Sequence, residues 1–339
     1  MLPDFYRPDH ARDAGYDPDP QALFEAAAPW RRAHAIRPAG EDRKNVHLLL
    51  IDLQRDFCFP SGSLYVGGRS GQGALDDNGR TAEFIYRNLK HLTNVTATMD
   101  SHLAFQIFSP SFWIDSAGEA LKPHRTIVLE DVHRGRVRPN PEVAAWLCQG
   151  DTSWLQNQVE HYCRELERGG KYTLYLWPPH CLLGSTGHAL AGVVHEARLF
   201  HSYVRGTQSW TEAKGENPLT ENYSVLSAEV LTHADGSALA RRNTSLTQRL
   251  LSADAIIVAG QAASHCVKSS VEDLLGAIQK QDAKLAKKVY LLEDCMSSVV
   301  VPGVSDFTPQ AEDALERFAE AGMHRVRSSS PMESWPDFR

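Results

Sequence analysis

Continuous apolar runs, each about the length of a β-strand, alternate along the chain with segments of helical periodicity. The apolar runs cover residues 46–52, 95–100, 172–177, 255–260 and 289–293. The helical patterns cover residues 21–33, 81–92, 154–168, 187–199, 246–251, 265–280 and 309–321. Unbroken apolar runs are typical of strands buried on both faces, so this alternation predicts a mostly parallel sheet covered by helices on both sides.

The polar residues that end these strands are spread from Asp52 to Cys266, which favours one domain with insertions over two domains. Residues 1–44 are rich in Pro, Asp, Arg and Ala and are expected to be an N-terminal extension, packed on the core or trailing from it. Residues 45–339 would form the main domain, with an insertion at about 103–171 that serves as a lid or an oligomer contact.

The composition is that of a globular protein, with 339 residues, 42% hydrophobic and 23% charged. The net charge of −7 and the lack of a long basic run give no electrostatic reason to expect nucleic acid or a membrane as a partner. The N-terminus lacks a secretion-signal pattern and no apolar run is long enough to span a bilayer, so we expect a cytoplasmic protein that binds a small molecule.

Cys266 follows an apolar strand and a Gly/Ala/Ser turn, at the start of a predicted helix. A thiol at a helix start lies near the positive end of the macrodipole, which favours the thiolate, and unpaired backbone N–H groups there can stabilise an oxyanion. The six cysteines are scattered without C-x-x-C spacing and are expected to be free thiols. Cys266 is therefore a candidate nucleophile, although a packed core thiol fits this segment equally well.

Polar residues at other strand ends are candidates for acid–base or metal chemistry. Asp52 could be a general base or a carboxylate that caps a turn. Asp100 and His102 are two residues apart in an extended segment, so their side chains point to the same side and can reach one ion. His180, at another strand end, could be a third ligand. One carboxylate with two imidazoles suits zinc, iron or manganese.

The remaining candidates are less specific. Lys214 lies in a predicted loop, where a solvated surface lysine is the ordinary interpretation. The aromatic residues Phe57, Trp177 and Tyr223 lie close in sequence to the polar positions. They could hold a flat ring by stacking, or they could simply fill the core.

Taken together, these segments resemble the nicotinamidase and cysteine-hydrolase branch of the isochorismatase-like superfamily. The resemblance lies in five separate motifs that occur in the family's order and cover residues 46 to about 325. They are D-x-Q-x-D-F at Asp52 to Phe57, D-x-H at Asp100 to His102, W-P-x-H-C at Trp177 to Cys181, the lysine loop from Lys214 to Ser224, and the nucleophile turn from Gly260 to Val267.

The resemblance implies a three-layer α/β/α fold with a mostly parallel six-stranded sheet. It implies that Cys266 is the nucleophile, that Asp52 takes the thiol proton and that Lys214 orients the pair. It also implies a cis peptide at Gln261–Ala262, and an oxyanion hole formed by the backbone N–H groups of Ala262 and Cys266.

For the ligand site, the resemblance implies that Asp100, His102 and His180 bind a divalent metal, with zinc expected and iron or manganese as alternatives. Phe57 and Trp177 would sandwich a pyridine ring, with Tyr223 beside them. The implied reaction is hydrolysis of nicotinamide, or of another small carboxamide, through a cysteine thioester. A homo-oligomer is a further family expectation.

Two features depart from the family pattern. Some members have a further metal-binding histidine six residues after the D-x-H histidine, where this chain has Phe108. The extension and the insertion also exceed the compact core of the family and could reshape the substrate entrance. Two alternatives remain: a non-catalytic member that binds a ligand or serves as a scaffold, and a vinyl ether hydrolase of the same fold, against which the cysteine argues.

Overall fold

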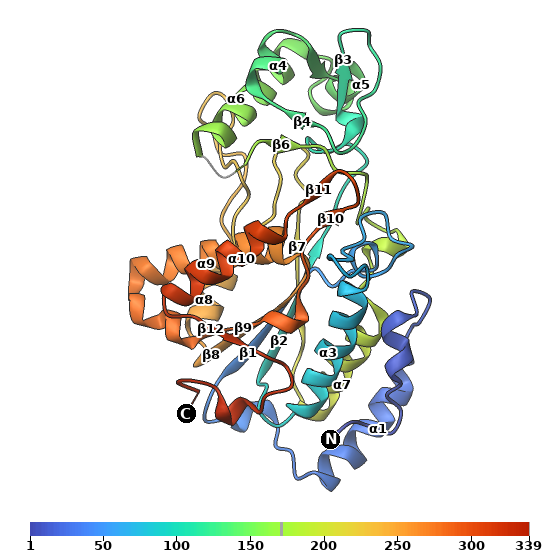
Figure 1. The fold of residues 1–339 in the computed structure, drawn as a ribbon, viewed down its shortest axis with the longest axis vertical. Helices are drawn as coiled ribbons and strands as arrows, with labels where there is room; N and C mark the ends of the chain where they lie inside the picture. The colour runs from blue at the N-terminus through green and yellow to red at the C-terminus, as the bar shows by residue number, and fades with distance from the viewer. Residues whose placement is uncertain (170–171, 339) are drawn as a thin grey trace.

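A computed structural model describes residues 1–169 and 172–338 (Figure 1). Its centre is a six-stranded sheet in the order β12-β9-β8-β1-β2-β7, in which every pair of neighbours is parallel. The strands are β1 (Val46–Ile51), β2 (Asn94–Asp100), β7 (Trp210–Lys214), β8 (Ala255–Gly260), β9 (Val289–Leu292) and β12 (His324–Val326). The central strands β1 and β8 are buried throughout, as their unbroken apolar sequences predict.

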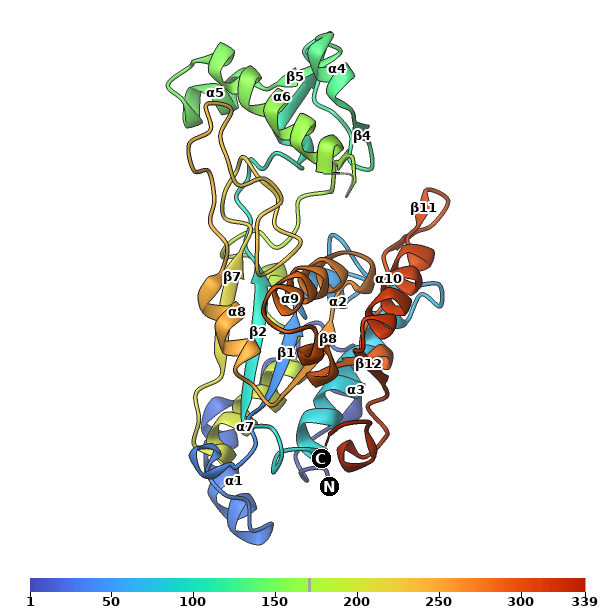
Figure 2. The same ribbon diagram turned by 90° about the vertical axis from the view of Figure 1, so that its left-hand side faces the viewer.

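Helices cover both faces of the sheet, which gives three layers (Figures 1 and 2). One face carries α1 (Pro20–Ala33), α3 (Gly73–Arg87) and α7 (Gly192–Arg205), and the other carries α8 (Thr244–Leu251), α9 (Lys268–Gln281) and α10 (Thr308–Glu320). This architecture confirms the predicted α/β fold with a mostly parallel six-stranded sheet.

A second, smaller lobe lies beyond the carboxyl ends of the central strands (Figures 1 and 2). It contains β3 (Trp113–Asp115), β4 (Thr126–Ile127), α4 (Leu129–His133), β5 (Val137–Pro139), α5 (Pro141–Leu147), α6 (Thr152–Gly169) and β6 (Leu174–Tyr175). Its apolar core includes Trp113, Leu155 and Tyr162, and it is joined by Leu219 and Val230 from the long loop that precedes α8. Two segments far apart in the sequence therefore build this lobe.

The N-terminal segment packs against the main domain. Helix α1 contacts α7 along its length, and Tyr6, Leu23 and Ala27 are buried in the main hydrophobic core. Beyond the carboxyl end of β1, Nη2 of Arg55 makes an ion pair of 2.7 Å with Oδ1 of Asp17. The extension thus supports the core from outside and does not trail from it.

The structure differs from the predicted elements in the sheet's edges. The run 172–177 is not a central strand, because only β6 is extended there and it pairs antiparallel with β4 in the small lobe. The two edge strands, β7 and β12, were not predicted. Each is short and mostly polar or exposed, because an edge strand is covered on fewer sides than a central one and needs no unbroken apolar run.

Two helices also begin at different residues from those predicted. Helix α3 begins at Gly73 and not near residue 81, because the buried polar residues Asp77 and Asn78 in its first half disturb the apolar periodicity. Helix α7 begins at Gly192 and not at residue 187, because the first residues of the predicted helix form a separate turn, Thr186–His188. These shifts leave the topology unchanged.

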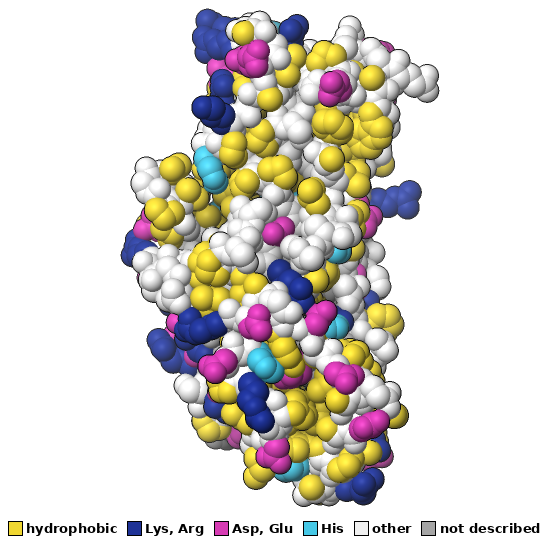
Figure 3. Space-filling model, turned by 90° about the vertical axis from the view of Figure 1, so that its right-hand side faces the viewer, with side chains coloured by type: hydrophobic (Ala, Val, Ile, Leu, Met, Phe, Trp, Pro, Cys, Tyr) yellow, Lys and Arg dark blue, Asp and Glu magenta, His cyan; other side chains and the backbone are white. Residues whose placement is uncertain are grey.

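The surface carries charges of both signs. Figure 3 shows acidic and basic side chains interspersed over one face of the molecule, without a large patch of a single sign. Among the described residues, none of the helices combines the length and the apolar character needed to cross a lipid bilayer.

Buried histidines predict that the fold loses stability in mild acid. His47 on β1 is 0% exposed, its Nε2 lies 2.9 Å from Thr96 Oγ1, and burial lowers the pKa of its imidazole to about 4. An unfolded histidine binds a proton near pH 6.5, so stability is greatest above that pH and falls as the pH drops toward 4. At pH 5 this one residue should cost about 2 kcal/mol relative to pH 7.5.

Urea unfolding at pH 7.5 and pH 5 measures this loss directly. We expect His47→Gln to make the dependence of the unfolding free energy on pH shallower, since glutamine does not titrate. The control is His133→Gln, which replaces a histidine that is exposed on the small lobe. Equal slopes for wild type and His47→Gln would show that His47 does not contribute.

Candidate active site

Four neighbouring strands deliver the candidate catalytic residues to one place. Asp52 follows β1, Asp100 ends β2, Lys214 ends β7, and Cys266 follows the turn after β8. These strands are adjacent in the sheet, in the order β8-β1-β2-β7, and are parallel, so their carboxyl ends meet at the same edge. The structure thus brings together residues that are more than two hundred positions apart in the sequence.

The ammonium group of Lys214 lies at the centre of this set. Its Nζ is 2.9 Å from Oδ2 of Asp52, 2.7 Å from Oδ1 of Asp100 and 3.6 Å from Sγ of Cys266. It also donates a hydrogen bond of 2.8 Å to the carbonyl oxygen of Asn222. The side chain is 2% exposed, so the interpretation as a solvated loop lysine is wrong: Lys214 ends a strand and points inward.

The charges of this set stabilise one another. Burial by itself would lower the pKa of Lys214, but the carboxylates of Asp100 and Asp52 raise it well above its usual value. Burial would likewise raise the pKa of Asp100, but Lys214 and His102 hold it well below its usual range. Lys214 is therefore protonated and Asp100 ionised at neutral pH, as a compensated buried ion pair requires.

Asp52 is the fully buried carboxylate of the set. Its backbone N–H donates a hydrogen bond of 3.1 Å to Thr98 Oγ1, and the Thr98 hydroxyl donates in turn to its Oδ1. Burial raises the pKa of Asp52, against the lowering effect of Lys214. A carboxylate with a raised pKa is a stronger base than an exposed one, which suits proton transfer near neutral pH.

Cys266 lies in one turn of π-helix, Ala263–Val267, that leads directly into α9. Burial raises the pKa of its thiol well above the usual value, and although Lys214 acts in the opposite direction, Asp52 and Asp100 add to the rise. Desolvation therefore opposes the stabilisation of a thiolate that is expected at a helix start, and a nearby base is needed to remove the thiol proton.

Hydrogen bonds from outside the predicted site hold the turn before Cys266. The peptide Gln261–Ala262 is cis, as the resemblance implied. The Gln261 side chain donates a hydrogen bond of 2.8 Å from Nε2 to Asp77 Oδ2 and accepts one of 3.2 Å from the Ser297 backbone N–H. Sequence reasoning missed Asp77 and Ser297, because a single acid in a helix and a single loop serine carry no distinguishing pattern.

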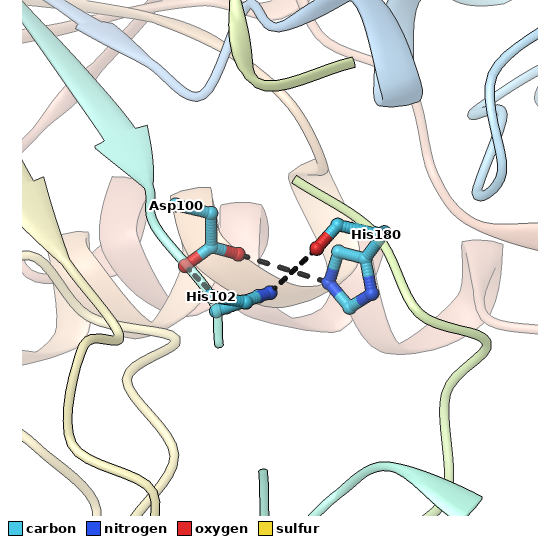
Figure 4. Close-up of side chains that lie close together, drawn as sticks. All are labelled: Asp100, His102 and His180. Atoms are coloured by element: carbon cyan, nitrogen blue, oxygen red, sulfur yellow. Dashed lines mark hydrogen bonds and ion pairs between the residues drawn. The ribbon is translucent and has the colours of Figure 1, made fainter. Parts of the chain in front are cut away.

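The three candidate metal ligands, Asp100, His102 and His180, lie close together (Figure 4). Nε2 of His102 is 3.2 Å from Oδ1 of Asp100, and Nε2 of His180 is 3.9 Å from Oδ2 of the same carboxylate. One ligand atom from each residue lies within 4.8 Å of the others, and all three side chains are buried. This spacing leaves room for one ion among the three.

The hydrogen bonds of the two imidazoles fit a metal. Nδ1 of His102 bonds to the carbonyl oxygen of His180 at 2.9 Å, and Nδ1 of His180 bonds to the carbonyl oxygen of Pro178 at 2.7 Å. A carbonyl oxygen can only accept, so both Nδ1 atoms carry the proton and both Nε2 lone pairs face Asp100. Burial and the neighbouring His102 lower the pKa of His180 to about 4, which keeps its imidazole neutral, as a ligand must be.

A second group of possible donors, Asp52, Asp100 and Cys266, also lies within 4.8 Å. The Lys214 ammonium already contacts all three and supplies the compensating positive charge, so this group does not suit a metal.

Phe108 packs against the candidate metal site, where the centre of its ring lies 4.8 Å from the centre of the His102 ring. An apolar side chain thus stands where some family members would have a further ligand.

A small cavity opens onto Cys266 and the metal ligands, and the three predicted aromatic residues, Phe57, Trp177 and Tyr223, all line it. Trp177 Nε1 donates a hydrogen bond of 2.7 Å to the Tyr223 hydroxyl, which fixes two of the rings. Sequence reasoning missed the other six residues of the lining: Leu64, Val66, Glu221, Asn222, His265 and Val299. Glu221 and Asn222 come from the lysine loop, whose path over the small lobe no local pattern predicts.

Comparisons with known proteins found a similar sequence and a similar fold. The chain is 27% identical over 278 residues to the nicotinamidase of Escherichia coli (strain K12), an alignment that covers 80% of this chain and 89% of that protein. The fold is similar to that of the yeast nicotinamidase Pnc1p bound to the inhibitor nicotinaldehyde, with a TM-score of 0.51 and 16% identity over 83% of this chain and 99% of the yeast chain.

The Acinetobacter baumanii nicotinamidase/pyrazinamidase has a TM-score of 0.48 to this structure, at 19% identity over 85% of this chain and 99% of that chain. No protein-family model matches the chain.

The ligand geometry predicts that His180→Ala weakens metal binding. Metal-free protein titrated with Zn²⁺ should bind close to one ion per chain, and loss of one of three side-chain ligands should raise the dissociation constant by at least about tenfold. His133→Ala, on the surface of the small lobe, is the matched control and should bind like wild type. Unchanged zinc affinity in His180→Ala would place the ion elsewhere.

Proposed function

We propose that this chain, whose sequence is similar to that of a nicotinamidase, is a nicotinamidase-like cysteine hydrolase that converts nicotinamide to nicotinate and ammonia at Cys266. The observation that carries the proposal is the buried Lys214 ammonium, which contacts Asp52, Asp100 and the Cys266 sulfur at once. A carboxylate base and a cation beside a thiol favour formation of the thiolate, which is the form that attacks a carbonyl carbon.

The first step is removal of the thiol proton. A carboxylate oxygen of Asp52 lies within 4.8 Å of Cys266 Sγ, and burial raises the pKa of Asp52, which makes this carboxylate a better acceptor for the thiol proton. Lys214 compensates for the thiolate as it forms. The sulfur then attacks the carboxamide carbon, and the backbone N–H groups of Ala262 and Cys266 would stabilise the negative oxygen of the tetrahedral intermediate.

The next steps return the proton and release the acid. Asp52 gives its proton to the departing nitrogen, the C–N bond breaks, and ammonia leaves a thioester on Cys266. Asp52 then takes a proton from water, the resulting hydroxide attacks the thioester carbon, and the C–S bond breaks. The products are the free carboxylic acid and the regenerated thiol.

The remaining residues hold the substrate. Asp100, His102 and His180 would bind a divalent ion, best matched by zinc, with iron and manganese as alternatives; when bound, it supplies an anchor for the ring nitrogen, directly or through water. Phe57 lies at the His180 side of the cavity, with 5.4 Å between the two ring centres. With Trp177 and Tyr223, it would enclose a flat heteroaromatic ring.

A different small carboxamide is the second candidate substrate. Glu221 is 4% exposed, lines the cavity and accepts a hydrogen bond of 3.1 Å from the Tyr172 hydroxyl. This carboxyl group comes from the loop that packs on the small lobe, and it offers a hydrogen-bonding partner for a polar substituent on the substrate. A panel of small amides, assayed for ammonia release, separates the two substrates.

Replacement of the nucleophile should abolish turnover. We expect Cys266→Ala to reduce ammonia release from nicotinamide by at least about 10³-fold, because neither the metal nor Asp52 can form the thioester. Cys163→Ala, a buried thiol in the small lobe, should retain activity and controls for the loss of a sulfur atom. Turnover in Cys266→Ala close to that of wild type would rule out the covalent route.

Replacement of the proposed base, Asp52, should lower kcat without unfolding the protein. Asp52→Asn keeps the size of the side chain but cannot take the thiol proton, so kcat should fall by about 10² to 10⁴-fold. The exposed Glu216→Gln serves as the matched carboxylate control. If steady-state kinetics gave Asp52→Asn a kcat within about twofold of wild type, a factor well below the range for general base catalysis, another group would have to be the base.

A further inference from the structure

A second cavity lies against the catalytic cavity, on the other side of a wall of three side chains. Trp177, Tyr223 and His265 line both cavities. The second cavity has a volume of about 470 Å³, within the range of pockets that hold a small organic ligand. It is built from both parts of the molecule, since Thr126 and Tyr175 come from the small lobe and Gln310 comes from α10.

Aromatic rings form most of the apolar lining of this second cavity. They are Tyr172, Tyr175, Trp177, Tyr223, His265 and Phe307. The rings contact one another, with ring centres 4.5 Å apart for Tyr175 and Trp177 and 4.8 Å apart for His265 and Phe307. Such a wall offers flat faces and ring edges to a planar ligand, which gains both apolar burial and ring stacking there.

One positive charge faces this aromatic lining. Lys268, the first residue of α9, is the only charged side chain among the lining residues, and within the described part of the chain no ion pair or hydrogen bond engages its ammonium group. Burial, together with Lys268, lowers the pKa of the neighbouring His265 to about 3, so that imidazole stays neutral.

We propose that this second cavity is a binding site for a planar aromatic carboxylate, whose ring lies among the aromatic side chains and whose carboxylate meets Lys268. Charge complementarity selects an anion, because the lining holds a cation and no acidic side chain. The volume and the rings select an aromatic ligand over a small inorganic anion. The acid formed by the proposed hydrolysis belongs to this class, a link that rests on the proposed function.

The test is a calorimetric titration of the metal-loaded full chain with benzoate at fixed ionic strength. Benzyl alcohol, which lacks the charge, and cyclohexanecarboxylate, which lacks the aromatic ring, are the comparison ligands. We expect wild type to bind benzoate more tightly than either. Lys268→Met should weaken the benzoate site by about tenfold or more, since a hydrogen-bonded charge pair is lost. Lys268→Arg should retain the site.

Lys280→Met is the matched control, because Lys280 lies exposed in the last turn of the same helix. Equal benzoate affinity in wild type and Lys268→Met would overturn the proposal, and so would equal affinity of wild type for benzoate and benzyl alcohol. Nicotinamide hydrolysis is measured in parallel and should be unchanged in Lys268→Met. If no variant hydrolyses nicotinamide, the proposed function fails, while benzoate binding still decides the second site.

Discussion

The structure depends on the compensation of one buried cation. The Lys214 ammonium is removed from water, and it is stable there because two carboxylates lie within 2.9 Å of it. Removal of one partner from a buried ion pair costs about 3 to 5 kcal/mol, since it leaves an uncompensated charge. The register of the sheet meets this requirement directly, because Asp100 and Lys214 are paired residues of the neighbouring strands β2 and β7. The position of the edge strand is thus tied to the chemistry of the site.

The same arrangement couples the thiol to the metal ligands. Oδ1 of Asp100 contacts both Lys214 Nζ and His102 Nε2, so one carboxylate belongs to the ion pair and to the candidate metal site. Burial raises the pKa of the Cys266 thiol, and a charge formed on its sulfur would be balanced by a lysine that is already in place. Such preorganisation would lower the cost of forming the proposed nucleophile, because no group has to move to meet the new charge.

The sequence predicts those features that depend on apolar strands and on residues directly after them. Asp52, Asp100 and Cys266 end or follow strands that the sequence predicts, and the parallel sheet places them at one edge. Lys214 ends a polar edge strand, Trp-Thr-Glu-Ala-Lys, whose sequence resembles a loop. Its burial follows from a pairing with β2 that is more than a hundred residues away in the sequence, and no local pattern contains that information.

The small lobe and its contributions to the site are also outside what local patterns can predict. The run 172–177 has the composition of a central strand, yet it pairs with β4 in the lobe and leads into the loop that carries Trp177 and His180. Glu221 reaches the cavity wall only because the lysine loop packs on that lobe. The motifs therefore locate the candidate nucleophile and the candidate metal ligands, whereas the tertiary packing determines the shape of the space around them.

The most direct test of the central claim is to identify the covalent intermediate. Wild-type enzyme would be mixed with nicotinamide, quenched in acid within the first turnover, digested and analysed by peptide mass spectrometry. The account predicts an acyl group on the peptide that contains Cys266, on no other cysteine peptide, and absent when nicotinamide is omitted. Ammonia release without acylation of Cys266, or acylation of a different residue, would contradict it.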